Sequence, residues 1–458
     1  GTIVKEKKKI GLTGCILMGI GCIVGSGIFG SLPEIISTTG GGIVYALILA
    51  AIVIILRSIT RMYTIAALPT SASTFMHATK LMHPYVGALI SVNAFLQPTM
   101  VALFGVLFAT YFQELFPGCP LSSTTVSVCL LAAFAVLAGF GNKSTISVGN
   151  IIVIILLAAI AVYIVCGLPH LNPENISFMS VIKPGISVSA VSAAAGVLTS
   201  SLSGASSCAE LADDVKNPGR NVPITLIVCP VLVCLTYILM AVVTLGVVPY
   251  ANLESLAQVA RHFLSPELMI FFIVGGPIAG IITSLIPVAL ACVAVFDFSS
   301  RNRIYPEVLS KKNKYGVPYW SLLIVSAISI GICATGATFG VVMTVFSLTN
   351  TIGELPNTIS PIFAYKKYPK SCDNSSVRMS SKVATALSVI TFLICIYLCV
   401  EMVKTLGIQE IALTAAVYLL GYVYFFVRVR YLRQKENYDL IGELKKPYER
   451  WMEREKSL

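Results

Sequence analysis

The chain has 458 residues, of which 56% are hydrophobic and only 12% are charged. A soluble protein carries about 25% charged residues, so this composition excludes an ordinary water-soluble chain. The formal net charge of +11 would suit an acidic partner such as nucleic acid, but the positions of the basic residues give it another explanation.

Apolar residues recur in blocks of about twenty, the length that a helix needs to cross about 30 Å of hydrocarbon. Residues 1–10 contain four lysines and lead directly into the first block, so we expect no signal peptide. We predict about twelve membrane-spanning helices, at 11–38, 42–66, 84–113, 122–140, 146–167, 189–212, 224–247, 269–298, 319–336, 338–364, 383–402 and 408–430.

The distribution of lysine and arginine predicts the orientation of these spans. If residues 1–10 are cytoplasmic, the outer loops and outer span ends hold only Lys183, Arg261 and Lys404 of the 32 basic residues. Cytoplasmic loops of membrane proteins carry the excess of Lys and Arg. We therefore expect a multi-pass protein of the plasma (inner) membrane with a cytoplasmic N-terminus and a cytoplasmic tail at 431–458, and no nucleic acid partner.

The first predicted span is rich in glycine at membrane depth. Residues 11–30 contain seven glycines, and Gly25, Ser26 and Gly27 follow one another near the middle. Each glycine weakens a helix by about 1 kcal/mol, and an unwound segment is tolerated where it lines a cavity. Freed N–H groups there can hold a carboxylate and freed carbonyls an ammonium. The alternative is a helix-packing face, because Gly21 and Gly25 have the GxxxG spacing.

The sixth predicted span favours the cavity interpretation. Hydroxyl groups and one glycine lie at membrane depth there, at Ser200, Ser201, Ser203, Gly204, Ser206 and Ser207. In a five-plus-five inverted repeat, with repeats at 11–167 and 189–364 and two further helices at 383–430, spans one and six correspond to each other. Paired interrupted helices of this kind indicate the binding site of a transporter.

Several motifs resemble the amino acid–polyamine–organocation family of permeases over nearly the whole chain. They are GSGIF from Gly25, Gly204 followed by DDVKNPGRNVP from Asp213, HPYVG from His83, Ile304-Tyr305-Pro306 and Tyr315-Gly316-Val317-Pro318.

This resemblance implies an all-α, LeuT-like inverted-repeat fold, alternating access and a site between spans 1, 3, 6, 8 and 10. By the same match, the backbone around Ile23, Gly25, Ser26 and Gly27 would hold the substrate carboxylate. The backbone around Ser201 and Gly204 would hold the amino group. Ser200 and Ser203 belong to the same candidate site.

The chain departs from the family pattern at several positions. Many members carry an acidic residue where this chain has Ser206, and an aromatic lid where it has serines before Gly204. Residues 69–73 replace a Ser-Gly-Gly stretch, so the inner gate is expected to differ. Some relatives place a lysine in span five, where this chain has Leu156 in a span without charge. The missing cation favours exchange over proton-coupled uptake.

Two spans carry polar side chains that would select a substrate. The resemblance places Gln97 of span three against the substrate, the alternative being a hydrogen bond between helices. Glu354 of span ten is a candidate counter-ion for a cationic substrate or a proton site, since an intramembrane acid is a functional candidate. Its alternative is a pair with a neighbouring span. Asp297 is expected to pair with Arg301 at i,i+4.

No cofactor or metal is expected. The thirteen cysteines form no CxxC pair, and the four histidines fall in loops or at span ends. The segment around Cys119 resembles the position where the light chains of heteromeric transporters join a heavy chain, but the rest of the sequence favours a bacterial single-chain permease, so no heavy-chain partner is expected. A monomer and a homodimer both remain open.

The leading hypothesis is therefore a sodium-independent secondary amino acid (or amino acid/amine) exchanger. Proton-coupled symport through Glu354 is the alternative within the transporter class. A membrane enzyme would need an intramembrane catalytic set, and a channel would need repeated pore-lining segments or charged rings. Neither pattern is present, and no Walker-type loop suggests ATP-driven pumping. The identity of the substrate is left open.

Overall fold

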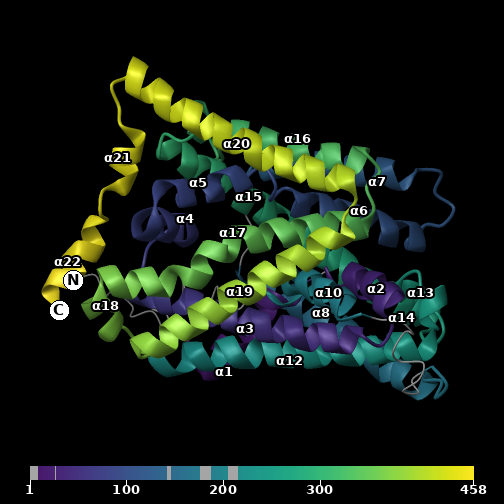
Figure 1. Cartoon of the computed structure of the whole chain (residues 1–458). Helices are drawn as coiled ribbons and strands as arrows, with labels where there is room; N and C mark the ends of the chain where they lie inside the picture. Colours follow the sequence, from purple (N-terminus) through teal and green to yellow (C-terminus); the bar gives the residue numbers. More distant parts are fainter. Residues whose placement is uncertain (1–8, 26, 142–145, 176–186, 205–214) are drawn as a thin grey trace, which may run out of the picture.

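The computed structural model describes residues 9–25, 27–141, 146–175, 187–204 and 215–458. Within these ranges the chain is helical apart from turns, loops and the isolated bridges Ile10–Val215 and Lys312–Pro318. This confirms the all-α prediction. The long helices run roughly side by side along one direction of the molecule (Figure 1).

The helices of the first half follow the predicted apolar blocks. They are α1 (Leu12–Ile23), α2 (Ile28–Thr39), α3 (Ile43–Ala67), α4 (Ser73–His77), the π-helical η1 (Ala78–Met82), α5 (Pro84–Asn93), α6 (Thr99–Leu115), α7 (Ser123–Ala138), α8 (Ile146–Gly167) and the short η2 (Leu168–His170).

The second half continues the pattern and ends in two short helices. They are α10 (Val188–Leu202), α12 (Pro218–Val247), η4 (Tyr250–Asn252), α13 (Leu256–Ala260), α14 (Pro266–Ile273), the π-helical η5 (Val274–Ile278), α15 (Ala279–Arg301), η6 (Glu307–Ser310), α16 (Tyr319–Ala334), α17 (Phe339–Lys367), α18 (Pro369–Asp373), α19 (Ser381–Thr405), α20 (Ile408–Lys435), α21 (Leu440–Lys445) and α22 (Glu449–Ser457).

Six helical stretches among the described residues are long and apolar enough to cross a membrane. They are Ile43–Ala67, Asn150–His170, Gly219–Val247, Pro266–Arg301, Ser381–Thr405 and Ile408–Lys435. A seventh is added if α1 and α2, which are bent by 62° at a short break, count as one span. Twelve spans and the inverted repeat remain predictions, because the count of twelve also needs the shorter apolar helices and α17.

Two predicted spans are less regular than the sequence pattern suggested. The stretch 84–113 is divided into α5 and α6, and Pro98 stands at the N-cap of α6. Proline has no N–H and is tolerated at the start of a helix rather than inside it. In the stretch 269–298, α14 joins α15 through the π-helical η5, which contains Pro277. Proline is the cause here too, because Pro277 has no N–H to donate to a regular helical hydrogen bond.

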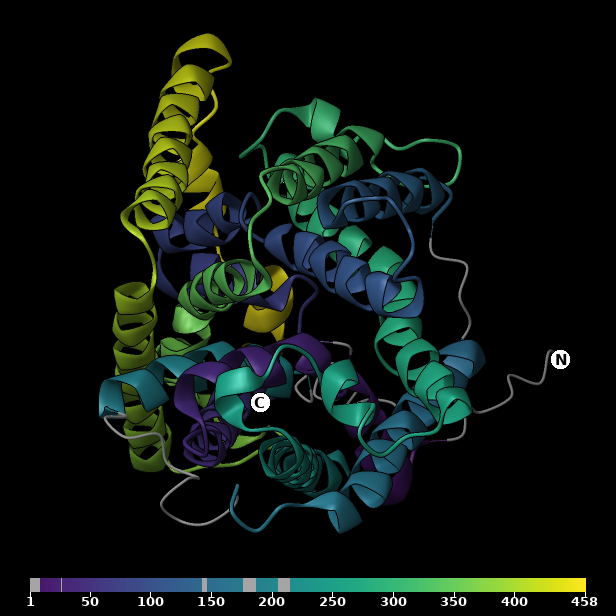
Figure 2. The same ribbon diagram turned by 90° about the vertical axis from the view of Figure 1, so that its right-hand side faces the viewer.

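The core forms around α3, which packs against α10, α12 and α17. Hydroxyl pairs join neighbouring helices across this interior: Thr64 to Ser360 at 2.7 Å and Tyr163 to Thr244 at 2.6 Å. Such pairs satisfy polar groups that hydrocarbon cannot solvate. Figure 2 shows α19 and α20 along one side of the bundle, with α20 projecting beyond it.

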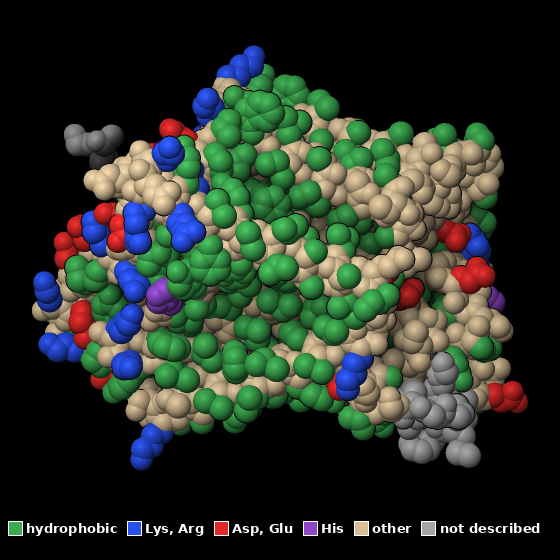
Figure 3. Space-filling view, turned by 45° about the horizontal axis from the view of Figure 1, so that its top comes forward, with side chains coloured by type: hydrophobic (Ala, Val, Ile, Leu, Met, Phe, Trp, Pro, Cys, Tyr) green, Lys and Arg blue, Asp and Glu red, His purple; other side chains and the backbone are tan. Residues whose placement is uncertain are grey.

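The segment after α20 folds back onto one end of the molecule as α21 and α22. Trp451 is 1% exposed, and its indole N–H donates to the carbonyl of Pro69 at 3.1 Å. The Glu455 carboxylate accepts from the backbone N–H groups of Lys370 and Ser371 at 3.0 and 2.8 Å. Lysine and arginine side chains gather at this same end (Figure 3).

Candidate functional site

The first predicted span is interrupted where the glycines predict it. Helix α1 ends at Ile23 and α2 begins at Ile28. Among the residues that the structure describes, no atom apart from the chain neighbours lies within 4 Å of where a Cβ would stand at Gly25 or Gly27, so the backbone here faces open space. The end of α1, with its carbonyls, and the start of α2, with its N–H groups, thus lie close together, and their dipoles suit opposite charges. Ser26 lies outside the described residues.

The sixth predicted span also stops at membrane depth. Helix α10 ends at Leu202, Ser203 is extended, and Gly204 has φ +131°. A side chain at Gly204 would overlap the carbonyl oxygen of Cys22, near the end of α1. The ends of α1 and α10 therefore meet backbone to backbone. Residues 205–214, including Ser206, lie outside the described part of the chain.

Three candidate serines at the end of α10 already have partners in the protein. The Ser200 hydroxyl lies 3.0 Å from that of Ser347 on α17, and the Ser201 hydroxyl lies 3.3 Å from that of Ser31 on α2. Ser203 donates to the Ser200 carbonyl at 3.1 Å. The first two contacts hold α10 against α17 and against α2, the helix that follows the break in span one.

A separate cavity of about 740 Å³, which we call the inner cavity, opens between α3, α4, α5, α15 and α17 and has polar and charged side chains in its wall. It brings together Gln97 and Glu354, the two candidates from spans three and ten. The described residues at the ends of α1 and α10 do not line it. Its lining is Arg61, Thr70, Ser71, Ala72, Ser73, Thr74, Phe75, Met76, Ile90, Asn93, Gln97, Ala291, Ala294, Val295, Phe298, Arg301, Asn302, Asn350, Gly353, Glu354 and Tyr448.

Glu354 belongs to a charged cluster with two arginines of α3. Its Oε1 lies 3.8 Å from Nη1 of Arg61, and its Oε2 accepts from the Asn357 amide at 2.8 Å. Arg57, one helical turn before Arg61, is 9% exposed and also acts electrostatically on Glu354. Sequence reasoning paired Glu354 with no named residue and passed over both arginines. Two cations four residues apart inside a predicted span were the available signal.

Asn93, four residues before Gln97 in span three, forms hydrogen bonds that join three helices. Its side chain donates to the Thr349 carbonyl at 3.1 Å and accepts from the Tyr418 hydroxyl at 2.7 Å. It thus ties α5 to α17 and α20. Gln97 lies in the turn between α5 and α6 and is half-buried at the cavity wall.

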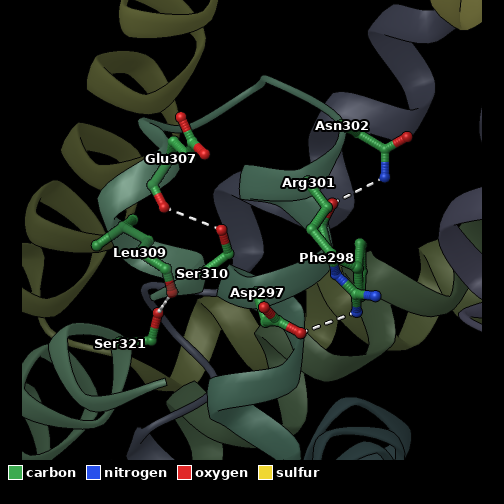
Figure 4. Close-up of polar contacts among 8 residues, drawn as sticks. All are labelled: Asp297, Phe298, Arg301, Asn302, Glu307, Leu309, Ser310 and Ser321. Carbon is green, nitrogen blue, oxygen red and sulfur yellow. Dashed lines mark hydrogen bonds and ion pairs between the residues drawn. The ribbon is translucent and has the colours of Figure 1, made fainter. Parts of the chain in front are cut away.

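The predicted pair of Asp297 and Arg301 is present at 2.8 Å on the last turn of α15 (Figure 4). Figure 4 also shows how hydroxyl groups hold the following loop: Ser310 donates to the Glu307 carbonyl at 2.9 Å, and Ser321 to that of Leu309 at 2.6 Å. The Ile304-Tyr305-Pro306 motif lies in this loop. Within the motif, the Pro306 carbonyl accepts from Ser300 and the Tyr305 hydroxyl donates to the Ser91 carbonyl, both at 2.6 Å, so the motif has a structural role.

A larger recess of about 1000 Å³ lies between α16, α17 and α20. Its lining is mostly apolar and contains none of the candidate residues. Among the residues that the structure describes, no group of three His, Cys, Asp or Glu side chains could hold a metal ion. Cys119 is half-buried in the turn after α6.

Comparison with known proteins finds similarity over most of the chain. The family model described as amino acid permease matches residues 14–438. The chain is 25% identical over 341 residues to the methylthioribose transporter of Bacillus subtilis (strain 168), covering 69% of this chain and 72% of that protein.

Two further proteins of Bacillus subtilis (strain 168) are similar. One is the branched-chain amino acid permease BcaP, 24% identical over 344 residues, covering 68% of this chain and 71% of that protein. The other is an aspartate-proton symporter, 26% identical over 272 residues, covering 57% of this chain and 52% of that protein. Their names point to three different solutes, so these relatives agree on transport and differ in what they transport.

Proposed function

This chain belongs to the amino acid permease family, and from that premise we propose that it is a sodium-independent secondary amino acid exchanger that works by alternating access. Its relatives are transporters, and it is a multi-pass membrane transport protein rather than an enzyme.

The observation that carries the proposal is the meeting of two interrupted helices. The break between α1 and α2 and the end of α10 lie against each other at Cys22 and Gly204. An amino acid carries a carboxylate and an ammonium on one carbon. The N–H groups at the start of α2 suit the carboxylate, and the carbonyls at the ends of α1 and α10 suit the ammonium. The open space at Gly25 and Gly27 leaves room for this backbone recognition.

The inner cavity supplies one side of the proposed access path. It lies toward the end of the molecule that carries α18 and α22 (Figure 1), where basic side chains gather on the face shown in Figure 3. Because basic residues mark the cytoplasmic side, we assign this end, and both termini, to the cytoplasm. Substrate would reach the helix breaks through this cavity in one state and from the opposite end in the other.

Exchange is favoured over proton coupling by two features. Leu156 occupies α8 where some relatives carry a lysine, and it is 2% exposed. Glu354, the acid that proton coupling would use, forms an ion pair with Arg61. Proton-coupled symport remains the second candidate, because one relative is named an aspartate-proton symporter.

Reconstitution in liposomes separates the two modes. Vesicles loaded with unlabelled amino acids are expected to accumulate a labelled amino acid, and empty vesicles are not. Uptake into empty vesicles under an inward proton gradient, lost in Glu354→Gln, would establish symport instead.

A glycine substitution tests the site itself. Gly27→Leu is expected to abolish exchange while the protein still inserts and purifies as a monodisperse species. Gly331→Leu is the matched control, since Gly331 lies within α16 and also faces open space. Full exchange in Gly27→Leu would remove the broken helix from the mechanism.

A further inference from the structure

Pro33 leaves one carbonyl of α2 without its usual hydrogen-bond donor. In an α-helix each carbonyl accepts from the N–H four residues later, so the carbonyl of Phe29 would accept from residue 33. Residue 33 is a proline inside α2, and proline has no N–H. Phe29 is the second residue of α2, directly after the break in span one, and it is buried. A carbonyl at membrane depth needs a donor from elsewhere in the protein.

The Tyr111 hydroxyl supplies this donor. It reaches from α6 to the Phe29 carbonyl at 2.8 Å, and both residues are 1% exposed. Their rings meet edge to face, with centroids 6.4 Å apart. One helical turn earlier on α6, Leu107 lies so close to Gly30 that an added Cβ there would come within 2.8 Å of the leucine side chain. Helix α6 therefore contacts the first turn of α2 both by a hydrogen bond and by close packing.

Two other helices contact this turn through side chains. The Ser31 hydroxyl lies 3.3 Å from that of Ser201 on α10, and the ring of Phe29 packs against Phe272 of α14 with centroids 5.7 Å apart. The contact of Tyr111 differs in kind, because it is made to the main chain. It fixes the orientation of the peptide group that follows Phe29, and with it the direction of the first turn of α2.

The first turn of α2 is also where the proposed exchange function places the substrate carboxylate. The first N–H groups of a helix have no partner within it, and α2 begins with Ile28 and Phe29 at the break. We propose that Tyr111 is a positioning residue: its hydroxyl replaces the donor that Pro33 lacks and thereby aligns these N–H groups for the carboxylate. The inference rests on the proposed function, and it assigns Tyr111 no contact with the substrate.

A double-mutant cycle tests the proposal. Tyr111→Phe removes only the hydroxyl, and Pro33→Ala restores an N–H that can donate to the Phe29 carbonyl. The wild type is first offered labelled leucine, serine, glutamate and lysine in proteoliposomes, and the amino acid that it exchanges fastest is used for every variant. Tyr111→Phe is expected to raise KM at least fivefold with less than a twofold change in maximal rate, because misaligned N–H groups weaken substrate binding. In the Pro33→Ala background the same substitution should raise KM less than twofold.

The alanine background separates positioning from other roles of Tyr111. Loss of ring packing, or of a direct contact between the hydroxyl and the substrate, would act equally in both backgrounds, because Pro33→Ala repairs neither. An unchanged KM in Tyr111→Phe, or an equal rise in both backgrounds, would therefore overturn the proposal. Tyr305→Phe is the matched control, since that hydroxyl also donates to a main-chain carbonyl, that of Ser91 at 2.6 Å. It should lower the Tm without changing KM, and a rise in KM as large as that of Tyr111→Phe would also overturn the proposal.

Thermal unfolding keeps this inference testable apart from exchange. Tyr111→Phe should lower the Tm more in the wild type than in the Pro33→Ala background, because only the former leaves a buried carbonyl without its donor. Equal losses would contradict the proposal. If Tyr111→Phe alone does not fold, the double variant should fold and exchange with the KM of Pro33→Ala, and a double variant that also fails to fold would contradict it.

The failure of the proposed function would be recognised separately. If the wild type exchanges none of the four amino acids, the exchange function is refuted. The rise in Tm caused by whichever of the four stabilises the protein most then decides the inference. A rise that is smaller in Tyr111→Phe and restored by Pro33→Ala would support the positioning role, and a rise unaffected by Tyr111→Phe would overturn it.

Discussion

Gly204 lies against the carbonyl of Cys22, and this contact joins the end of α10 to the end of α1. A side chain at Gly204 would overlap that oxygen, and its φ of +131° is one that L-residues rarely adopt. Only glycine therefore fits, because both the space and the backbone conformation exclude a Cβ. The two helix interruptions depend on this one residue for their closest approach.

Gly204→Ala is expected to reduce exchange by at least tenfold, because the added Cβ forces the two backbone segments apart. The protein should still insert, since the bundle around α3 does not include this contact. Counterflow in liposomes measures the effect. Gly331→Ala within α16 is the control, and equal activity of the two variants would show that the close approach is not needed for transport.

Asn93 and Gln97 are expected to separate stability from transport. Asn93→Leu removes the partners of the Thr349 carbonyl and the Tyr418 hydroxyl, and a buried polar group left unsatisfied costs about 1–3 kcal/mol. It should lower the Tm of the purified protein clearly. Gln97→Leu, at the cavity wall, should change KM with a smaller change in Tm. If instead Gln97→Leu lowered the Tm more and Asn93→Leu changed KM more, Gln97 would have the structural role and Asn93 would contact the substrate.

The sequence was sufficient to locate the interruptions of spans one and six. Glycine and serine clusters at membrane depth are too unfavourable for an ordinary lipid-facing helix, so their position alone marks the break. The structure places the end of α1 at Ile23 and the end of α10 at Leu202, inside the predicted spans. The short interruption at residues 335–338 also separated the predicted spans 319–336 and 338–364, and α16 ends at Ala334 and α17 begins at Phe339.

The packing partners of Arg61 and Glu354 could not be predicted from a single sequence. Arg61 and Glu354 lie on α3 and α17, and nothing in a single chain indicates which helices pack together. The inner cavity draws its lining from at least five helices. Pro98 was visible, but a proline in an apolar stretch is compatible with a kinked continuous helix as well as with the division between α5 and α6.

The charged cluster predicts an asymmetric mutational response. Glu354→Gln leaves Arg57 and Arg61 without their shared carboxylate, whereas Arg61→Gln leaves a balanced pair of Arg57 and Glu354. We therefore expect a lower Tm for Glu354→Gln than for Arg61→Gln. The double variant should lie between them, because it removes one cation and the anion together. Thermal unfolding at fixed pH and salt measures the series, and identical Tm values would show that the cluster makes no net contribution.

The docking of α22 is expected to depend on pH through His77. Its Nε2 lies 2.9 Å from the Leu68 carbonyl oxygen, and its ring centroid is 5.5 Å from that of Trp451. Burial lowers the pKa of His77 from 6.5 to about 4. Between these values the unfolded segment binds a proton that the docked segment excludes. The contribution to stability is therefore complete above pH 6.5 and is lost as the pH falls toward 4.

Fluorescence of Trp451 reports this undocking when the other tryptophan is removed by Trp320→Phe. We expect emission to shift to longer wavelength as the pH falls from 6.5 toward 4.5, and His77→Gln to flatten the change. Glu455 shifts the other way: burial raises its pKa, but hydrogen bonds from Ser371 and the Lys370 N–H outweigh burial and hold that pKa below its ordinary value. A transition unchanged by His77→Gln would assign the pH dependence to another group, because His77 would then contribute nothing to docking.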